Sequence, residues 1–203
     1  MASIRNIAQE QAAPSPTAER LLDAAREAVL SVGFRRTTLS DVARRAQVSR
    51  MTVYRTYPDM TTIFGDLMTR EWGQVVEAVI ADVETREEDD PAARIAQVLV
   101  GVLAALREDA LLRRVIDVDP ELLLPYLVDR RGRSQDAVID LLAARIASGQ
   151  EHGIRAGDPV VLARTLALAA QGFLLSAATM TDDAVSLTTL DAELVELVRR
   201  YLA

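Results

Sequence analysis

The sequence contains no cysteine, and this absence removes several classes of protein at once. Without thiols the chain cannot form a disulfide scaffold, a thiolate metal site or a cysteine nucleophile. Histidine is almost as scarce: His152, beside Glu151, is the only one, and a single Glu-His pair usually lies on the surface. The sequence also lacks a GxGxxG segment, a phosphate-binding loop, a nucleophile elbow and an HExxH motif. We therefore expect no enzymatic activity, no catalytic residues, no metal and no cofactor.

Long uninterrupted apolar runs are absent too. Residues 1–16 contain no stretch of the kind that forms the core of a signal peptide. The most apolar segment, residues 160–180, is interrupted by Arg164 and Gln171, which disfavours a membrane span. These features predict a cytoplasmic chain that does not enter a membrane.

Lysine is missing as well, so all 23 basic residues are arginine. Because this bias extends over the entire chain, we interpret it as the composition of a GC-rich genome. The net charge of −7 is unevenly distributed, with +3 on residues 17–60 and −10 on residues 61–203. A basic segment joined to an acidic body is expected when only one end of a protein meets phosphate.

Half of the 203 residues are apolar, and their spacing is helical almost throughout. No segment shows the sustained alternation of a half-buried strand, so the sequence predicts an all-α protein of about nine or ten helices. A flexible arm over residues 1–16 precedes a small helical domain over residues 17–60 and a larger one over residues 61–203. The expected helices cover residues 17–32, 38–46, 49–57, 59–86, 91–108, 110–117, 120–128, 134–148, 159–178 and 189–202.

The first expected helix has Thr17 as its N-cap and ends at Gly33, because a glycine after a helix readily adopts a positive φ. Phe34 then enters the core, and residues 35–37 form an exposed loop. The apolar face of this helix comprises Leu21, Leu22, Ala25, Ala28, Val29 and Val32.

Aspartate followed by proline marks three later helix starts, at Asp90, Asp119 and Asp158. Proline suits the first helical position, and aspartate before it is a favourable N-cap. Asp59 is expected to cap the long helix over residues 59–86, which would link the two parts of the chain.

The stretch from Thr38 to Tyr57 contains two short helices with a tight joint at Gln47 and Val48. Thr38 and Ser49 are the expected N-caps. The first of these helices spans only about two turns and depends on packing for its stability. The residues expected to face inward are Leu39, Val42, Ala43, Ala46, Val53 and Tyr57.

The remaining face of the second short helix is polar and aromatic, as expected for a helix that enters a DNA groove. Arg50 is suited to pair with guanine and Met51 to contact a thymine methyl group. Hydroxyl groups along the helix are suited to contact phosphate, and Arg55 to contact either base or phosphate. The helix N-terminus at Thr38 also favours phosphate. The complete set of expected DNA-binding residues is Arg36, Thr37, Thr38, Ser49, Arg50, Met51, Thr52, Tyr54, Arg55 and Thr56.

Residues 18–64 resemble the DNA-binding region of the tetracycline-repressor (TetR) family of bacterial transcription regulators. The segments that carry the resemblance are AAREAVLSVGF, TTLSDVARRAQVS and TVYRTYPD, followed by Ile63 and Phe64. The segment EHGIRAGDPVVLARTLALAAQGF is similar to the start of the family's penultimate long helix. The chain departs from the family at Gln47, where glycine is usual, and at Met60, where lysine is common.

The resemblance implies a homodimer that binds a double-stranded DNA operator, usually as a repressor, and a small-molecule effector in the C-terminal domain. Its last two helices would form the dimer interface, with apolar residues Leu190, Leu194, Leu197, Val198 and Tyr201 on the final helix. An alternative is burial of this face within one subunit. Few charges interrupt the inward helix faces, so we expect an apolar or aromatic effector. Candidate residues for its pocket are Met68, Trp72, Leu103, Leu123, Tyr126 and Phe173.

Two other classes of function remain open from the sequence alone. The helical hairpin could bind protein instead of DNA, in an all-helical interaction module. An enzyme is the less favoured alternative, because only His152 and its acidic neighbour offer a candidate group. Salt-dependent DNA binding would distinguish a regulator from both.

Overall fold

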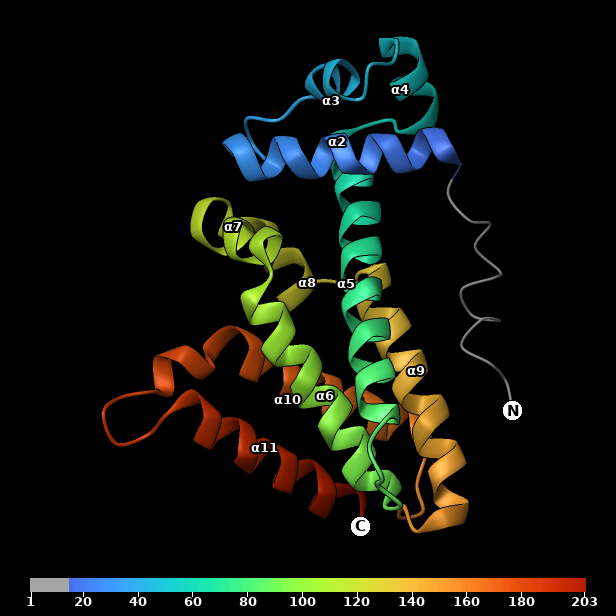
Figure 1. Cartoon of the computed structure of the whole chain (residues 1–203), viewed down its shortest axis with the longest axis vertical. Coiled ribbons are helices and arrows are strands. Elements are labelled where there is room, and N and C mark those ends of the chain that lie inside the picture. Colours follow the sequence, from blue (N-terminus) through green and yellow to red (C-terminus); the bar gives the residue numbers. More distant parts are fainter. Residues whose placement is uncertain (1–14) are drawn as a thin grey trace. The chain divides into compact units, whose positions relative to one another are not determined.

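The computed structural model describes residues 15–203, which form ten α-helices, three short 3-10 helices and no strand (Figure 1). This confirms the all-α prediction. Residues 1–14 of the expected arm lie outside the described residues. The α-helices are α2 (Pro16–Val32), α3 (Leu39–Arg45), α4 (Arg50–Thr56), α5 (Met60–Glu84), α6 (Pro91–Glu108), α7 (Ala110–Val118), α8 (Leu124–Val128), α9 (Arg133–Gly149), α10 (Pro159–Ser176) and α11 (Leu187–Leu202). The 3-10 helices are η1 (Pro120–Leu122), η2 (Gln150–His152) and η3 (Ala177–Met180).

The start of α2 differs from the prediction. Ser15, not Thr17, is the N-cap, and its hydroxyl accepts the N–H of Ala18 at 3.2 Å. Pro16 takes the first helical position, where its missing N–H costs nothing. The helix ends at Gly33 with φ +89°, as expected for a glycine stop, but Val32 is 38% exposed and lies outside the apolar face.

The chain divides into two compact units. The first contains the described residues up to Glu71 together with Ala110–Gly132, and the second contains Trp72–Asp109 together with Arg133–Ala203. The first unit therefore holds α2, α3, α4, α7 and α8, and the long helix α5 contributes its first half to this unit and its second half to the other.

In the first unit, α3 lies against α2 and α4 lies against α3 (Figure 1). Arg70 on α5 joins this helix to α2, because its guanidinium donates to Glu19 at 2.9 Å and to Asp23 at 2.8 Å. A second ion pair has its arginine on α2, where Arg26 donates to Glu71 of α5 at 2.7 Å. The fully buried apolar side chains of this unit include Leu21, Leu22, Val29, Val42, Val53, Ile63, Leu67, Leu111 and Leu112.

Asp119, between α7 and η1, does not cap the helix that it precedes, contrary to the sequence prediction. Its carboxylate instead accepts the backbone N–H groups of Phe34 at 2.7 Å and Arg35 at 3.4 Å. Only 2% of the residue is exposed. The adjacent Glu121 forms an ion pair with Arg35, so the end of α7 is bonded to the loop between α2 and α3. Aspartate caps at Asp90 and Asp158, by contrast, are confirmed.

The second unit has a core between α6, α9, α10 and α11, in which α11 lies along α6 and α10 along α9 (Figure 1). Leu194 and Val198 of α11 are fully buried in this core. They therefore pack within one subunit. The prediction that they belong to the dimer interface is wrong, and the alternative, burial within one subunit, holds for these two residues. Leu197, which projects from another side of the helix, is 49% exposed.

Helix α10, continued by η3, is unusually apolar and little buried. Residues Pro159–Met180 are long and apolar enough to cross a membrane, with a mean hydropathy of 1.6, yet only 22% of that window is buried. Leu162, Ala163 and Leu166 of this helix belong to the core of the unit. A core helix of a soluble protein can have the same length and composition, so these properties alone are weak evidence for a membrane span. The apolar surface that α10 leaves exposed needs another explanation.

Candidate nucleic-acid interface

The orientation of α4 is fixed by two buried side chains. Val53 is 0% and Tyr57 4% exposed, as the sequence predicts, and Ser49 caps the helix by accepting the N–H of Thr52 at 3.1 Å. Pro58 follows, and Tyr57 has the extended backbone expected before proline. The opposite face of α4 must therefore point away from the core.

The exposed face of α4 carries the side chains expected to read DNA. Met51 is 77% and Tyr54 53% exposed, and Arg50 and Arg55 are exposed beside them. Neither arginine is drawn into an ion pair among the described residues. An exposed methionine and tyrosine between two arginines make a surface with both donors and apolar groups, which is what base edges and thymine methyl groups require.

The hydroxyl groups of α4 are engaged in the helix itself. Ser49 and Thr52 share a hydrogen bond of 2.8 Å between their side chains, and the Thr56 hydroxyl donates to the carbonyl of Thr52 at 3.0 Å. A phosphate contact by Thr56 would have to exchange this internal bond for an external one. The hydroxyl group of Tyr54, in contrast, forms no such hydrogen bond among the described residues.

The N-terminus of α3 forms a capping box. The Thr38 hydroxyl accepts the N–H of Asp41 at 3.1 Å, and the Asp41 carboxylate accepts the N–H of Thr38 at 3.2 Å. Hydrogen bonds from the Thr38 hydroxyl and from Arg44 lower the pKa of Asp41 below its usual value. Because the Thr38 hydroxyl donates to Asp41, it is not free to bind a phosphate, and the predicted phosphate contact at this end of α3 would fall to backbone amides and to the exposed Arg36.

Thr37 is not part of an exposed loop, so that expectation is wrong. The residue is 4% exposed, and its hydroxyl donates to the carbonyl of Gly33 at 2.8 Å. Its backbone N–H donates to the carbonyl of Phe34 at 3.0 Å. Both donors of Thr37 therefore close the loop after α2, and a phosphate has no access to them in this conformation.

Acid should weaken the N-termini of α3 and α5. Asp41 has a lowered pKa, and so has Asp59, chiefly because its carboxylate accepts hydrogen bonds from Thr62. A lowered folded-state pKa means that the stabilisation is present above the unfolded-state value and is lost as the pH falls through the folded one. Below about pH 4 we therefore expect Asp41→Asn to flatten the dependence of the unfolding free energy on pH, and Thr38→Ala to do the same. Urea unfolding at a series of pH values measures this, and an unchanged slope in Asp41→Asn contradicts it.

The joint between α3 and α4 has the left-handed backbone that the family usually gives to glycine. Gln47 has φ +54° and is the one non-glycine residue with a positive φ in the described part of the chain. Hydrogen bonds at the joint include one from the N–H of Val48 to the carbonyl of Ala43 at 3.0 Å and one from Arg20 to the carbonyl of Ala46 at 2.6 Å. Sequence reasoning did not identify Arg20, because an arginine near a helix start carries no local sign of a bond to a residue 26 positions away.

Replacing Gln47 with glycine should stabilise the protein. A side chain in the left-handed region costs about 1–2 kcal/mol, part of which is offset by the greater freedom of glycine in the unfolded chain. We expect Gln47→Gly to raise the unfolding free energy by about 0.5–1 kcal/mol in urea titrations. The matched control is Gln74→Gly in the exposed middle of α5, which should lower it by a similar amount. A loss of stability in Gln47→Gly would contradict this view of the joint.

The six residues predicted to line an effector pocket belong to both units. Met68, Leu123 and Tyr126 lie in the first unit, and the other three lie in the second. Leu103 is a buried core residue against which Phe173 packs. The second unit has a groove of about 510 Å³ between α5, α6 and α11 and a cavity of about 300 Å³ between α6 and α9. Neither is lined by any of the six residues, whose role remains a prediction.

A packed three-helix unit that displays the polar face of its third helix defines the helix-turn-helix class of DNA-binding proteins. Comparisons with known proteins agree. Residues 21–67 match the profile of the tetR family of bacterial regulatory proteins. An HTH-type transcriptional regulator of Mycobacterium tuberculosis is 36% identical over 187 residues, which cover 92% of this chain and 94% of the relative. The chain belongs to the TetR family.

Solved structures share the fold. The transcriptional repressor QsdR of R. erythropolis superposes with a TM-score of 0.68 at 16% identity, covering 92% of this chain and 94% of the repressor. The structure of SmeT in complex with triclosan gives a TM-score of 0.58 at 22% identity, covering 90% of this chain and 89% of SmeT. The chain is thus a transcriptional regulator with a helix-turn-helix domain, in a family of DNA-binding proteins rather than of enzymes.

Proposed function

We propose that this regulator is a cytoplasmic repressor that binds an inverted-repeat operator as a homodimer and is released by a small apolar or aromatic effector. Residues 17–60 would be its DNA-binding domain and residues 61–203 its effector-binding and dimerisation domain. The observation that carries the proposal is the face of α4, where Arg50, Met51, Tyr54 and Arg55 are all exposed while Val53 holds the helix against the core.

The apolar surface of α10 supports the proposed dimer. Val161 is 57% and Leu168 71% exposed, and a Cβ built on Gly172 would meet nothing within 4 Å, which leaves room for a second helix to approach. Two such helices from each subunit can form a four-helix interface that a two-fold axis relates. To bind an inverted repeat, such a dimer has to place its two α4 helices at the spacing of successive major grooves, about 34–36 Å.

Leu168→Glu tests this interface by sedimentation velocity. A buried carboxylate without a partner is strongly unfavourable, so we expect a wild-type dimer and a monomeric variant. Val128→Glu, on the exposed face of α8, introduces the same charge at a residue that is 75% exposed and should stay dimeric. A dimeric Leu168→Glu would move the interface away from this face of α10.

The proposed effector chemistry rests on the groove between α5, α6 and α11. Its lining is mainly aliphatic, with Val79, Val83, Val100 and Val195, and only a few polar groups reach it. Pockets for small ligands are usually of this kind. An effector that favours the DNA-incompetent conformation by about 1–3 kcal/mol would change operator affinity enough to regulate transcription.

DNA binding is the experiment that decides the proposal. We expect fluorescently labelled DNA from the upstream region of the chain's own gene to bind, with an affinity that falls steeply as salt is raised, because phosphate contacts release counterions. Arg36→Ala, at a predicted phosphate-contacting residue, should lower the affinity for all DNA sequences and make the affinity less dependent on salt. Absence of binding even at low salt would overturn the proposal in favour of an all-helical interaction module.

A further inference from the structure

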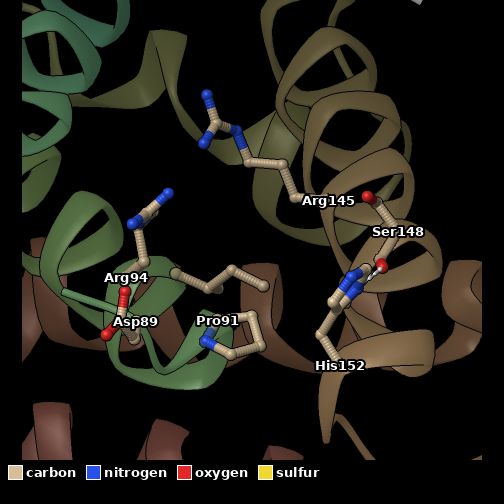
Figure 2. Close-up of a pocket in the computed structure, with 8 residues that line it drawn as sticks. Asp89, Pro91, Arg94, Arg145, Ser148 and His152 are labelled. Carbon is tan, nitrogen blue, oxygen red and sulfur yellow. Dashed lines mark hydrogen bonds between the residues drawn. The ribbon is translucent and has the colours of Figure 1, made fainter. Parts of the chain in front are cut away.

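The cavity of about 300 Å³ in the second unit is lined by cationic side chains, although this part of the chain is acidic overall. It lies between the first turns of α6 and the end of α9. Figure 2 shows Arg94 on α6 and Arg145 on α9 extending into the same region, with Ser148 and His152 on its far side. Two guanidinium groups that share one cavity repel each other unless an anion lies between them.

Arg94 has no carboxylate partner within residues 15–203. Its guanidinium donates to the backbone carbonyl of Glu88, a neutral acceptor, and its Nε is buried without a hydrogen-bond partner. A partly buried guanidinium of this kind normally pairs with an anion, since an unmatched charge away from water is unfavourable.

The guanidinium of Arg145 has a carboxylate partner at only one of its nitrogen atoms. Its Nη2 donates to the Glu84 carboxylate at 3.2 Å, while its Nε is buried and likewise has no partner. Asp89 also lines the cavity, but it is exposed and forms no ion pair with either arginine among the described residues. With Glu84 matched to Arg145, one positive charge, that of Arg94, is left for a ligand.

The remaining wall combines small apolar residues with Ser148 and His152. Ile95 and Pro91 contribute hydrocarbon to the lining, and Gly149 adds no side chain. The imidazole of His152 is oriented by a hydrogen bond of 3.1 Å between its Nδ1 and the carbonyl of Ser148. A volume of about 300 Å³ lies at the lower end of the range for small-molecule sites.

We propose that this cavity binds a small organic carboxylate. The carboxylate forms a two-pronged ion pair with Arg94 and lies beside the guanidinium of Arg145, and the apolar part of the ligand lies against Ile95 and Pro91. One uncompensated guanidinium matches a monoanion, whereas a phosphate dianion would leave an excess negative charge beside Glu84 and Asp89. The site uses residues of the second unit alone and does not depend on the DNA-binding role of α4.

Benzoate is a suitable probe because it combines a carboxylate with a small apolar ring, and benzamide is its neutral counterpart of almost the same shape. In calorimetric titrations of the full chain we expect saturable binding of benzoate and none of benzamide. Arg94→Gln and Arg145→Gln should each weaken benzoate binding at least tenfold. Arg130→Gln removes an exposed arginine after α8 that does not line the cavity, and should leave the affinity unchanged.

A direct readout does not depend on the variants folding. In ¹⁵N-labelled wild-type protein, benzoate should shift the Nε–H resonances of Arg94 and Arg145 and leave that of Arg130 in place. Either no shift, or equal shifts at all three arginines, overturns the proposal. Binding of inorganic phosphate without benzoate would overturn the assignment to carboxylates.

Discussion

Replacing Asp119 with alanine should lower the unfolding free energy by about 2–4 kcal/mol, a large fraction of the stability of a domain of this size. Asp119 is 2% exposed, and its carboxylate accepts the N–H groups of Phe34 and Arg35. Without it, two amides at the end of α2 lose a charged acceptor, and a space is left where the side chain contacts Gly33. Urea unfolding measures the loss.

The matched control is Asp117→Ala, which removes an exposed aspartate two residues earlier on α7 and should change the unfolding free energy by less than about 0.5 kcal/mol. Asp119→Asn keeps one acceptor oxygen and should fall between the wild type and Asp119→Ala. If Asp119→Ala is as stable as Asp117→Ala, the two amides are satisfied by water and the carboxylate is not the connection between α7 and the loop after α2.

Elements that depend on neighbouring residues were predictable from the sequence. The positions of α3 and α4 follow from Thr38 and Ser49 as N-caps, and the end of α4 from Pro58. Val53 and Tyr57 are buried because helical spacing places them on one side. These signals act within one or two turns of helix, which is why the orientation of the DNA-facing surface could be read before any tertiary contact was known.

Asp119 and Thr37 show where such reasoning fails. An aspartate before proline has the local pattern of an N-cap, but its carboxylate bonds instead to residues 84 and 85 positions away. Thr37 looks like a loop residue until its hydroxyl is seen to close the turn at Gly33. In both cases a buried backbone group elsewhere competes for the polar side chain, and only the folded chain reveals that competitor.

Periodicity has a related limit at α11. The pattern predicts that Leu194 and Val198 are covered, and both are buried. It does not identify the covering surface, which is the core of the same subunit rather than a second one. The face proposed to cover a partner lies on α10, where exposure and not periodicity distinguishes Leu168.

The sharpest test of the DNA-facing surface is a comparison of Arg50 with Tyr54. Arg50→Ala should weaken operator binding by about 1–3 kcal/mol, roughly 5- to 150-fold, if its fork pairs with guanine. The loss should be much smaller on unrelated DNA, and base substitutions at one operator position should cease to matter. Tyr54→Phe removes a phosphate-directed hydroxyl and should weaken operator and unrelated DNA by the same factor.

Fluorescence anisotropy with the operator, with single-base variants of it and with unrelated DNA separates these outcomes. Arg130→Ala, after the end of α8, is the control for loss of one positive charge, and should alter both affinities by less than about twofold. The two roles differ because Arg50 stands in the first turn of α4, which enters the groove in helix-turn-helix docking, whereas Tyr54 stands one turn further on. Equal losses on both DNAs in Arg50→Ala would place this arginine on phosphate and leave Met51 as the residue of the first turn that contacts bases.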